Sequence, residues 1–210
     1  MATAELTAAV EQLDRAASTA ELVEATRAIA ALQDTNAADA LIKVLGFNNP
    51  AVASVATAGL ISLGRPIVPK LLVSLDARNY GARAWVVKVL ASLRDPRGLD
   101  LLEHALKADI APSVRRAATR GLAELDLDLK ADGEAIGRCC NGLLLASQDD
   151  EWVVRYAAAF GLEQRLNSSS LPAPVRAQGL ASLRQLASSA EDVKVVRLRA
   201  TLALERLNAR

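Results

Sequence analysis

The stretch Val154–Leu162, VRYAAAFGL, decides the fold, because four other strings repeat its pattern. These strings are VASVATAGL from Val52, ARAWVVKVL from Ala82, VRRAATRGL from Val114 and VRLRATLAL from Val196. Each opens on a small apolar residue, has Ala or Val four places on, Gly, Ala or Val seven places on, and Leu eight places on. That spacing marks one face of an α-helix. The sequence therefore predicts five helices that bury the same face.

The intervals between these strings predict how the helices are arranged. The strings start 30, 32, 40 and 42 residues apart, and each follows a second amphipathic segment. Intervals of this size are typical of repeats that pair two helices and stack. We therefore predict an all-α fold, an α-solenoid of about six HEAT-like helical pairs. The expected pairs are about 4–16 with 20–32, 36–46 with 50–63, 66–76 with 79–93, 97–108 with 112–125, 131–147 with 151–166, and 173–188 with 192–207.

A stacked array has no central core to divide, so we predict a single HEAT-like repeat domain over residues 1–210. The first repeat, about residues 1–33, is expected to be an atypical capping repeat. Serines 168–170 and the prolines that follow predict a loop at about residues 167–174. Gly or Pro also stands at four other expected helix boundaries, within residues 48–50, 64–66, 95–98 and 111–112.

Composition excludes several classes of function. Lys and Arg number 25 against 24 Asp and Glu, so the basic excess of a dedicated nucleic-acid binder is absent. No apolar run approaches the roughly 20 residues that cross a bilayer, and we expect a cytoplasmic protein without a membrane partner. The adjacent Cys139 and Cys140 and the single His104 argue against a zinc site or a Ser-His-Asp triad, so no metal is expected.

One arginine recurs at the second position of the repeat string, at Arg83, Arg115, Arg155 and Arg197. An acid often precedes it, as at Asp76, Asp109, Asp150 and Asp192. In HEAT-like arrays such residues commonly pair between successive repeats, and this is the first interpretation. The alternative is that these arginines bind an anionic ligand.

Aromatic residues interrupt the repeat at equivalent positions. Tyr80 and Trp152 both stand two places before the string, in a chain with only 3% aromatic residues. Trp152, Arg155 and Tyr156 share a helix face, and a ring beside a guanidinium can stack on a planar ligand while the cation binds its carboxylate. Filling of gaps between helices remains the alternative.

Three further groups leave alternatives open. Arg116 and Arg120 stand one helical turn apart and repel unless an anion lies opposite, although a solvated face also explains them. Cys139 and Cys140 are either buried thiols or reactive ones that contact a ligand. Asp149 and Asp150 suit the start of the next helix, and they could also serve acid catalysis.

Four strings carry a resemblance to a known family. They are LIKVLGFNNP from Leu41, NYGARAWVVKVLASLRDPRGLDLL from Asn79, APSVRRAATRGL from Ala111 and ASQDDEWVVRYAAAFGL from Ala146. The chain resembles the HEAT-repeat phycobilin lyases of the E/F type, and most of all their F-type subunits, from about residue 20 to residue 207. The motifs Asn-Tyr-Gly-Ala-Arg and Glu-Trp-Val-Val-Arg-Tyr-Ala-Ala are specific beyond a general HEAT repeat.

The resemblance implies an enzyme that is active only with an E-type partner subunit. The pair would attach phycocyanobilin, an open-chain tetrapyrrole, to a cysteine of the phycocyanin α subunit through a thioether bond. Phycocyanobilin is then a substrate, and no cofactor is implied. The attacking thiolate belongs to the acceptor, which explains why this chain needs no nucleophile of its own.

The resemblance also suggests roles for individual residues. Candidates for binding the bilin are Tyr80, Arg83, Arg115, Arg116, Trp152, Arg155 and Tyr156, with the arginines facing the propionates. The catalytic candidates, which would face the pyrrole nitrogens, are Asp149 and Asp150, and the candidate thiol contacts are Cys139 and Cys140.

The resemblance also bears on the type of product. Isomerising relatives carry Asn-His-Cys near Arg138–Cys140, where this chain lacks the histidine, so attachment without isomerisation is predicted. Two other functions stay open. One is a non-catalytic HEAT scaffold or chaperone that binds a phycobiliprotein or bilin, and the other is a lyase subunit for phycoerythrobilin.

Overall fold

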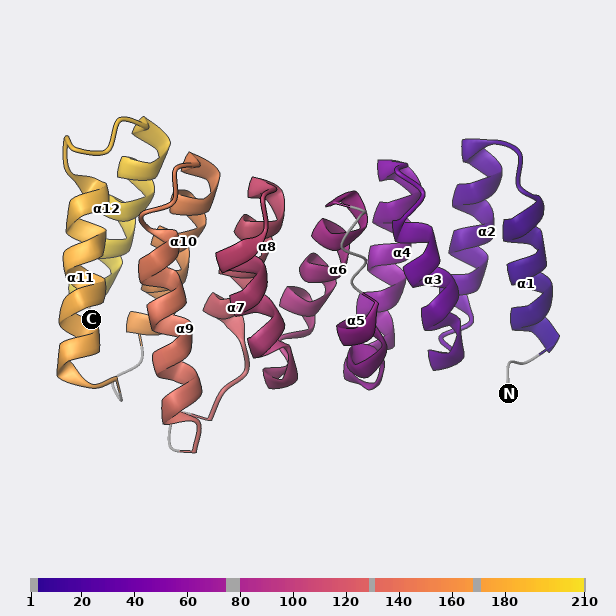
Figure 1. Ribbon diagram of the computed structural model, residues 1–210, viewed down its shortest axis with the longest axis horizontal. Helices are drawn as coiled ribbons and strands as arrows, with labels where there is room; N and C mark the ends of the chain where they lie inside the picture. The colour runs from indigo at the N-terminus through magenta and orange to yellow at the C-terminus, as the bar shows by residue number, and fades with distance from the viewer. Residues whose placement is uncertain (1–3, 75–79, 129–130, 168–170, 210) are drawn as a thin grey trace. The chain divides into compact units, whose positions relative to one another are not determined.

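The computed structural model describes residues 4–74, 80–128, 131–167 and 171–209, with the exception of the side chain of Tyr80. All regular structure in the described residues is helical (Figure 1). Contacts between residues divide the chain into two compact units, Met1–Leu93 and Arg94–Arg210. The all-α prediction is confirmed, and the single-domain prediction stays a prediction.

The first unit packs its helices in antiparallel pairs. Helix α2 contacts α1 and α4, and α4 also contacts α3 and α6. The helices are α1 (Ala4–Arg15), α2 (Thr19–Ala31), α3 (Ala38–Leu45), α4 (Pro50–Leu63), α5 (Val68–Val73) and α6 (Tyr80–Leu93), with short 3₁₀ turns at Thr35–Ala37 and Arg65–Ile67.

The second unit contains three helical pairs whose second helices pack side by side. Helix α10 contacts both α8 and α12, while α9 contacts both α7 and α11 (Figure 1). The helices are α7 (Leu99–Ala108), α8 (Pro112–Glu124), α9 (Gly133–Ala146), α10 (Trp152–Leu166), α11 (Ala173–Ala187) and α12 (Lys194–Asn208), and a 3₁₀ turn at Pro96–Gly98 precedes α7. The second helices therefore form one layer of this unit.

The predicted helices are present, and they differ from expectation mainly at their starts and at the end of α5, which lies at Val73 instead of residue 76. The segments expected from residues 66 and 97 begin as 3₁₀ turns, and the α-helices follow from Val68 and Leu99. Proline suits the start of a helix, where its missing N–H group is not needed. At Pro96 the preceding Asp95 also caps the turn by accepting a hydrogen bond from the N–H group of Arg97. The expected loop includes residues 168–170, which lie outside the described residues.

No single helix among the described residues is long and apolar enough to cross a membrane. Within the part of the chain that the structure describes, α4 and the following segment 65–73 together have that length and hydropathy, and a bend of 105° separates them.

Close approach between helices explains the glycine near the end of the strings in α4 and α10. A Cβ atom at Gly161 of α10 would lie 2.9 Å from Cβ of Ala123 and 2.4 Å from Cδ2 of Leu143. The same site in α4, Gly59, would place a Cβ 2.7 Å from Cβ of Ala30. Glycine therefore permits the contact between one repeat and the preceding repeat.

We predict that Gly161→Ala destabilises the protein by about 1–3 kcal/mol through overpacking, whereas Gly137→Ala stabilises it by up to about 1 kcal/mol. Gly137 is the matched control, because it lies inside α9 and a Cβ added there would meet no neighbouring side chain within 4 Å. Urea unfolding monitored by circular dichroism measures both free energies. Equal effects of the two substitutions would show that close approach is not the constraint at Gly161.

Candidate functional site

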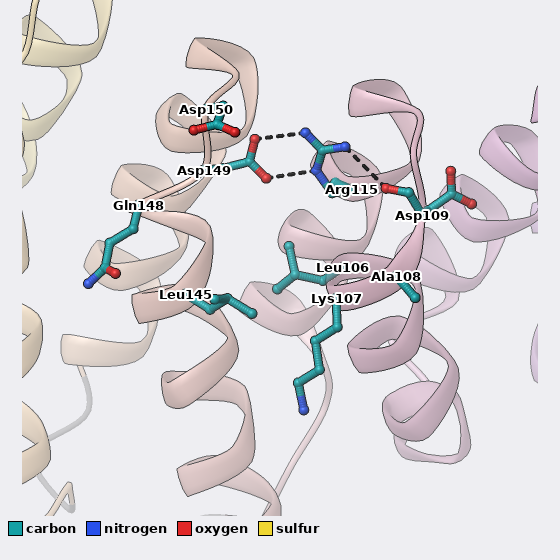
Figure 2. A pocket seen from close by; sticks show the side chains of 9 residues that line it. All are labelled: Leu106, Lys107, Ala108, Asp109, Arg115, Leu145, Gln148, Asp149 and Asp150. Atoms are coloured by element: carbon teal, nitrogen blue, oxygen red, sulfur yellow. Dashed lines mark hydrogen bonds and ion pairs between the residues drawn. The ribbon is translucent and has the colours of Figure 1, made fainter.

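Arg115 of α8 joins two successive repeats through a bidentate ion pair with Asp149. Its Nε and Nη2 atoms donate hydrogen bonds to the two carboxylate oxygens at 2.7 and 2.9 Å (Figure 2). Its Nη1 atom donates to the carbonyl oxygens of Asp109 and Ile110, which precede α8. One guanidinium thus stabilises its own turn and also the turn before α10.

Arg155 of α10 repeats this arrangement one helical pair later. Its Nε and Nη2 atoms donate to the carboxylate of Glu191 at 2.6 and 2.8 Å. Its Nη1 atom donates to the carbonyl oxygens of Asp149 and Asp150, both at 2.8 Å. In the second unit the predicted pairing between repeats is therefore confirmed.

The acids that form these pairs differ from those expected from the repeat pattern. The repeat pattern points to Asp150 and Asp192, but the structure uses the preceding residues Asp149 and Glu191. A carboxylate at either of these positions also accepts a backbone N–H group two residues later, from Glu151 or Val193. This turn geometry selects one acid of each neighbouring pair. Asp76 lies outside the described residues, as does the side chain of Tyr80.

The ion pairs fix the charge of both carboxylates. Burial tends to raise the pKa of Asp149, but hydrogen bonds from Arg115 and from the N–H group of Glu151 outweigh it and lower the pKa. Hydrogen bonding from Arg155 lowers the pKa of Glu191 against the effect of burial. Both groups are therefore anionic near neutral pH, and an anion held by a cation is a poor proton donor.

A pocket of about 340 Å³ lies beside the Arg115–Asp149 pair (Figure 2). The ends of α7 and α9 and the turns that follow them form its walls. Its lining residues are Leu106, Lys107, Ala108, Asp109, Arg115, Leu145, Gln148, Asp149 and Asp150. Asp150 is exposed, so of the two catalytic candidates it is the one whose carboxylate can meet a ligand.

The exposed surface of α8, α10 and α12 forms a second candidate site, the second-helix face. Equivalent positions of the repeat string place Arg116, Tyr156 and Leu198 in one row. Four residues later, Arg120, Phe160 and Leu202 make a second row, and the Arg120 guanidinium carbon lies 4.0 Å from the centre of the Phe160 ring. The face changes from cationic on α8, through aromatic on α10, to aliphatic on α12.

The side chains of Trp152 and Tyr156 are large, apolar and exposed, at 44% and 38% of their surfaces. With Phe160 they follow one side of α10 at intervals of four residues, a strip about 12 Å long. Arg155 does not join them, because its guanidinium is held by Glu191. The structure thus brings Trp152 and Tyr156 together with Arg116 on one face, while Arg115 and Arg155 serve the turns.

The thiols of Cys139 and Cys140 are buried in α9. Burial raises the pKa of Cys139 to about 11 and also raises that of Cys140, although the charge of Arg165 acts in the opposite direction. A neutral, buried thiol is a weak nucleophile. The structure therefore favours packing, one of the two interpretations that the sequence left open.

Sequence reasoning did not select Phe160 or the aliphatic residues of α12. Val195, Leu198 and Leu202 are exposed by 45%, 58% and 38%. Their signal was present, since the repeat strings place Leu198 and Leu202 at the same positions as Tyr156 and Phe160. An apolar residue at an exposed repeat position could therefore have identified them.

Loss of the ion pair between Arg155 and Glu191 should lower the free energy of unfolding and weaken its dependence on pH. We expect Glu191→Gln to destabilise the protein by about 1.5–3 kcal/mol at pH 7, because it leaves the Arg155 charge without its partner. The pKa of Glu191 is lower in the folded state, so its contribution is present above the unfolded value of about 4 and disappears as pH falls through the folded value.

Urea unfolding at pH 7 and at pH 3 measures both effects. Asp192→Asn is the matched control, because this neighbouring acid is exposed, and its cost should stay within about 0.5 kcal/mol. A larger cost for Asp192→Asn than for Glu191→Gln would contradict the assignment of the ion pair.

Comparisons with known proteins agree with this architecture. The family model of HEAT repeats matches residues 48–123, and that of the PBS lyase HEAT-like repeat matches residues 22–47. The bilin biosynthesis protein RpcF of Synechococcus sp. (strain WH8020) is 55% identical over 205 residues, with 96% of each chain covered. The phycocyanin alpha phycocyanobilin lyase CpcF of Synechocystis sp. (strain ATCC 27184 / PCC 6803 / Kazusa) is 41% identical, with 77% of each chain covered.

A solved structure is similar along most of the chain. It is that of the complex of CpcE and CpcF of phycocyanin lyase from Nostoc sp. PCC7120, which matches with a TM-score of 0.73 and 42% identity. The match covers 81% of this chain and 99% of the other.

Proposed function

The chain belongs to the HEAT-repeat phycobilin lyases of the E/F type, and we propose that it is the F-type subunit of a heterodimeric lyase. The enzyme attaches phycocyanobilin through a thioether bond to a cysteine of the phycocyanin α subunit. The name of the similar CpcF protein supports this acceptor, and the complex of CpcE with CpcF supports an E-type partner. A cytoplasmic location stays a prediction.

The second-helix face is the observation that carries this proposal. Exposed rings of Trp152 and Tyr156 lie between the cations of α8 and the aliphatic row of α12. An open-chain tetrapyrrole has the complementary chemistry, because it combines planar conjugated rings with two propionate carboxylates. Stacking on the aromatic strip and charge pairing with Arg116 would hold it in one orientation.

The reaction needs orientation more than it needs a nucleophile from this chain. The acceptor's thiolate forms a carbon–sulfur bond at the exocyclic ethylidene of the bilin, while the double bond opens and the tetrapyrrole takes up one proton. The overall reaction is the addition of a thiol across a double bond, and it has no leaving group. Holding the bilin in place raises the rate by proximity and limits attachment at wrong positions.

Asp150 is the acid that we assign to the pyrrole nitrogens. It is exposed and stands two residues before Trp152, at the start of the aromatic strip. Asp149 is less suited to this role, because Arg115 occupies both of its carboxylate oxygens. A carboxylate near the pyrrole nitrogens would stabilise the protonated tetrapyrrole, which is the more electrophilic form.

We propose attachment without isomerisation. In the region where isomerising relatives carry Asn-His-Cys, Arg138 donates hydrogen bonds to Asp100 and Glu103 at 2.6 and 2.8 Å. Cys139 and Cys140, which follow it, are buried. Packing and helix pairing therefore account for this segment.

A non-catalytic scaffold is the second candidate function. It is favoured by the involvement of Asp149, Arg115 and Arg155 in structural ion pairs and by the burial of both thiols. A phycoerythrobilin lyase subunit is the third, since the name of the 55% identical relative specifies no bilin.

Co-expression distinguishes these functions. The chain is produced with an E-type partner, the phycocyanin α subunit and either phycocyanobilin or phycoerythrobilin, and the α subunit is then denatured. We expect covalently bound, unisomerised phycocyanobilin only when both lyase chains are present. Colour that does not depend on this chain indicates a scaffold, and attachment of phycoerythrobilin alone identifies the other bilin.

The aromatic strip can be tested by one substitution. We expect Trp152→Ala to lower the transfer rate about tenfold, the equivalent of one stacking interaction, with unchanged helicity and thermal midpoint. Ile110→Ala, which removes another exposed apolar side chain outside the second-helix face, should leave the rate unchanged. A lower midpoint with normal transfer would assign Trp152 to packing instead.

A further inference from the structure

Arg199 of α12 is a buried arginine that is only partly satisfied. It is 7% exposed, and its Nη2 atom donates a hydrogen bond to Oε2 of Glu163 in α10. Its Nη1 atom is buried and has no hydrogen-bond partner among the residues that the structure describes. Buried polar groups are nearly always paired, so an unpaired N–H group of a charged side chain points to a missing acceptor.

Phe160 contacts this arginine and a second one. The guanidinium carbon of Arg199 is 5.4 Å from the centre of the ring, and that of Arg120 is 4.0 Å from it. Arg120 is exposed on α8, while Phe160 is half-buried. Both guanidinium groups therefore lie beside the same ring.

Arg199 and Arg120 each share a carboxylate with a second arginine. Glu163 also accepts a hydrogen bond from Arg206 at 3.3 Å, so its two oxygens are shared by two arginines. Glu124 likewise lies within 4 Å of both Arg94 and Arg120. Neither Arg120 nor Arg199 therefore has a carboxylate to itself.

We propose that Arg120 and Arg199 form a carboxylate-binding subsite of the second-helix face, beside the ring of Phe160. The proposal rests on the proposed function, because the ligand is a carboxylate of the bound tetrapyrrole. A propionate would supply the acceptor that Nη1 of Arg199 lacks. The carboxylate-binding role is thus assigned to this subsite and not to Arg115 and Arg155, whose guanidinium groups already bind Asp149 and Glu191.

The position of the subsite suits a ligand that has a conjugated body. Phe160 stands one helical turn after Tyr156 and two turns after Trp152, so the cations lie about 6 and 12 Å along α10 from these rings. The neighbouring residues Leu198 and Leu202 are exposed and apolar. Such surroundings favour a carboxylate carried by an apolar molecule over a free inorganic anion.

Binding to the chain in complex with its E-type partner tests the proposal. The probes are phycocyanobilin and its dimethyl ester, in which both carboxylates are neutral. Titrations followed by absorbance compare wild type with Arg120→Gln and Arg199→Lys, and the lysine retains the charge opposite Glu163. Arg184→Gln, an exposed arginine of α11, is the matched control.

We expect wild type to bind the acid at least about tenfold more tightly than the ester, as the loss of charged hydrogen bonds implies. Arg120→Gln and Arg199→Lys should each weaken binding of the acid about tenfold and barely change binding of the ester. Arg184→Gln should change neither. Tight binding of the acid that both substitutions leave unchanged would overturn the subsite and leave the proposed function intact.

A second measurement separates failure of the subsite from failure of the function. Arginine side-chain Nε–H signals of ¹⁵N-labelled protein are recorded while succinate is added. We expect concentration-dependent shifts for Arg120 and Arg199 that are absent for Arg184. Such shifts without bilin binding would retain a carboxylate site and refute the lyase, whereas unshifted signals would refute the subsite.

Discussion

The bidentate ion pair between an arginine and the acid of the next repeat is the interaction on which the second unit depends. Arg115 and Arg155 each bind a carboxylate and two turn carbonyls, so one side chain satisfies groups that helix ends would otherwise leave unpaired. Each pair also ties one helical pair to its neighbour. Because these bonds occupy the guanidinium groups of Arg115 and Arg155, a ligand has to be bound by residues outside the repeated pattern.

Small residues impose the second constraint. Gly161 and Gly142 lie so near Leu143 and Leu122 that an added methyl group would collide with them. Where the helices approach this closely, there is no space for a side chain at these two positions. The rings of Trp152 and Tyr156 lie on the exposed surface of the same helix, where they can meet a partner or a bilin. Packing of the repeat and the aromatic strip thus use different positions of α10.

A lyase of this kind can work with few catalytic groups. The acceptor supplies the thiol and the bilin supplies the reactive double bond, so the protein has to orient both and exclude wrong products. A face that runs from arginine through aromatic rings to aliphatic side chains is adequate for that task. Arg199 and Glu163 add a charged group beneath this face, which links the proposed recognition of carboxylates to the contact between α10 and α12.

The sequence by itself determined the helices and their pairing, because these follow from a periodic pattern in which Val154, Ala158 and Leu162 mark the buried side. The resemblance of its unrepeated motifs to a known family predicted the function. Only the tertiary structure decided between neighbouring acids, since Asp149 and Asp150 differ in turn geometry and not in chemistry. It also showed the partly satisfied Arg199 beside Phe160, because a missing hydrogen bond depends on distances between helices that no local pattern records.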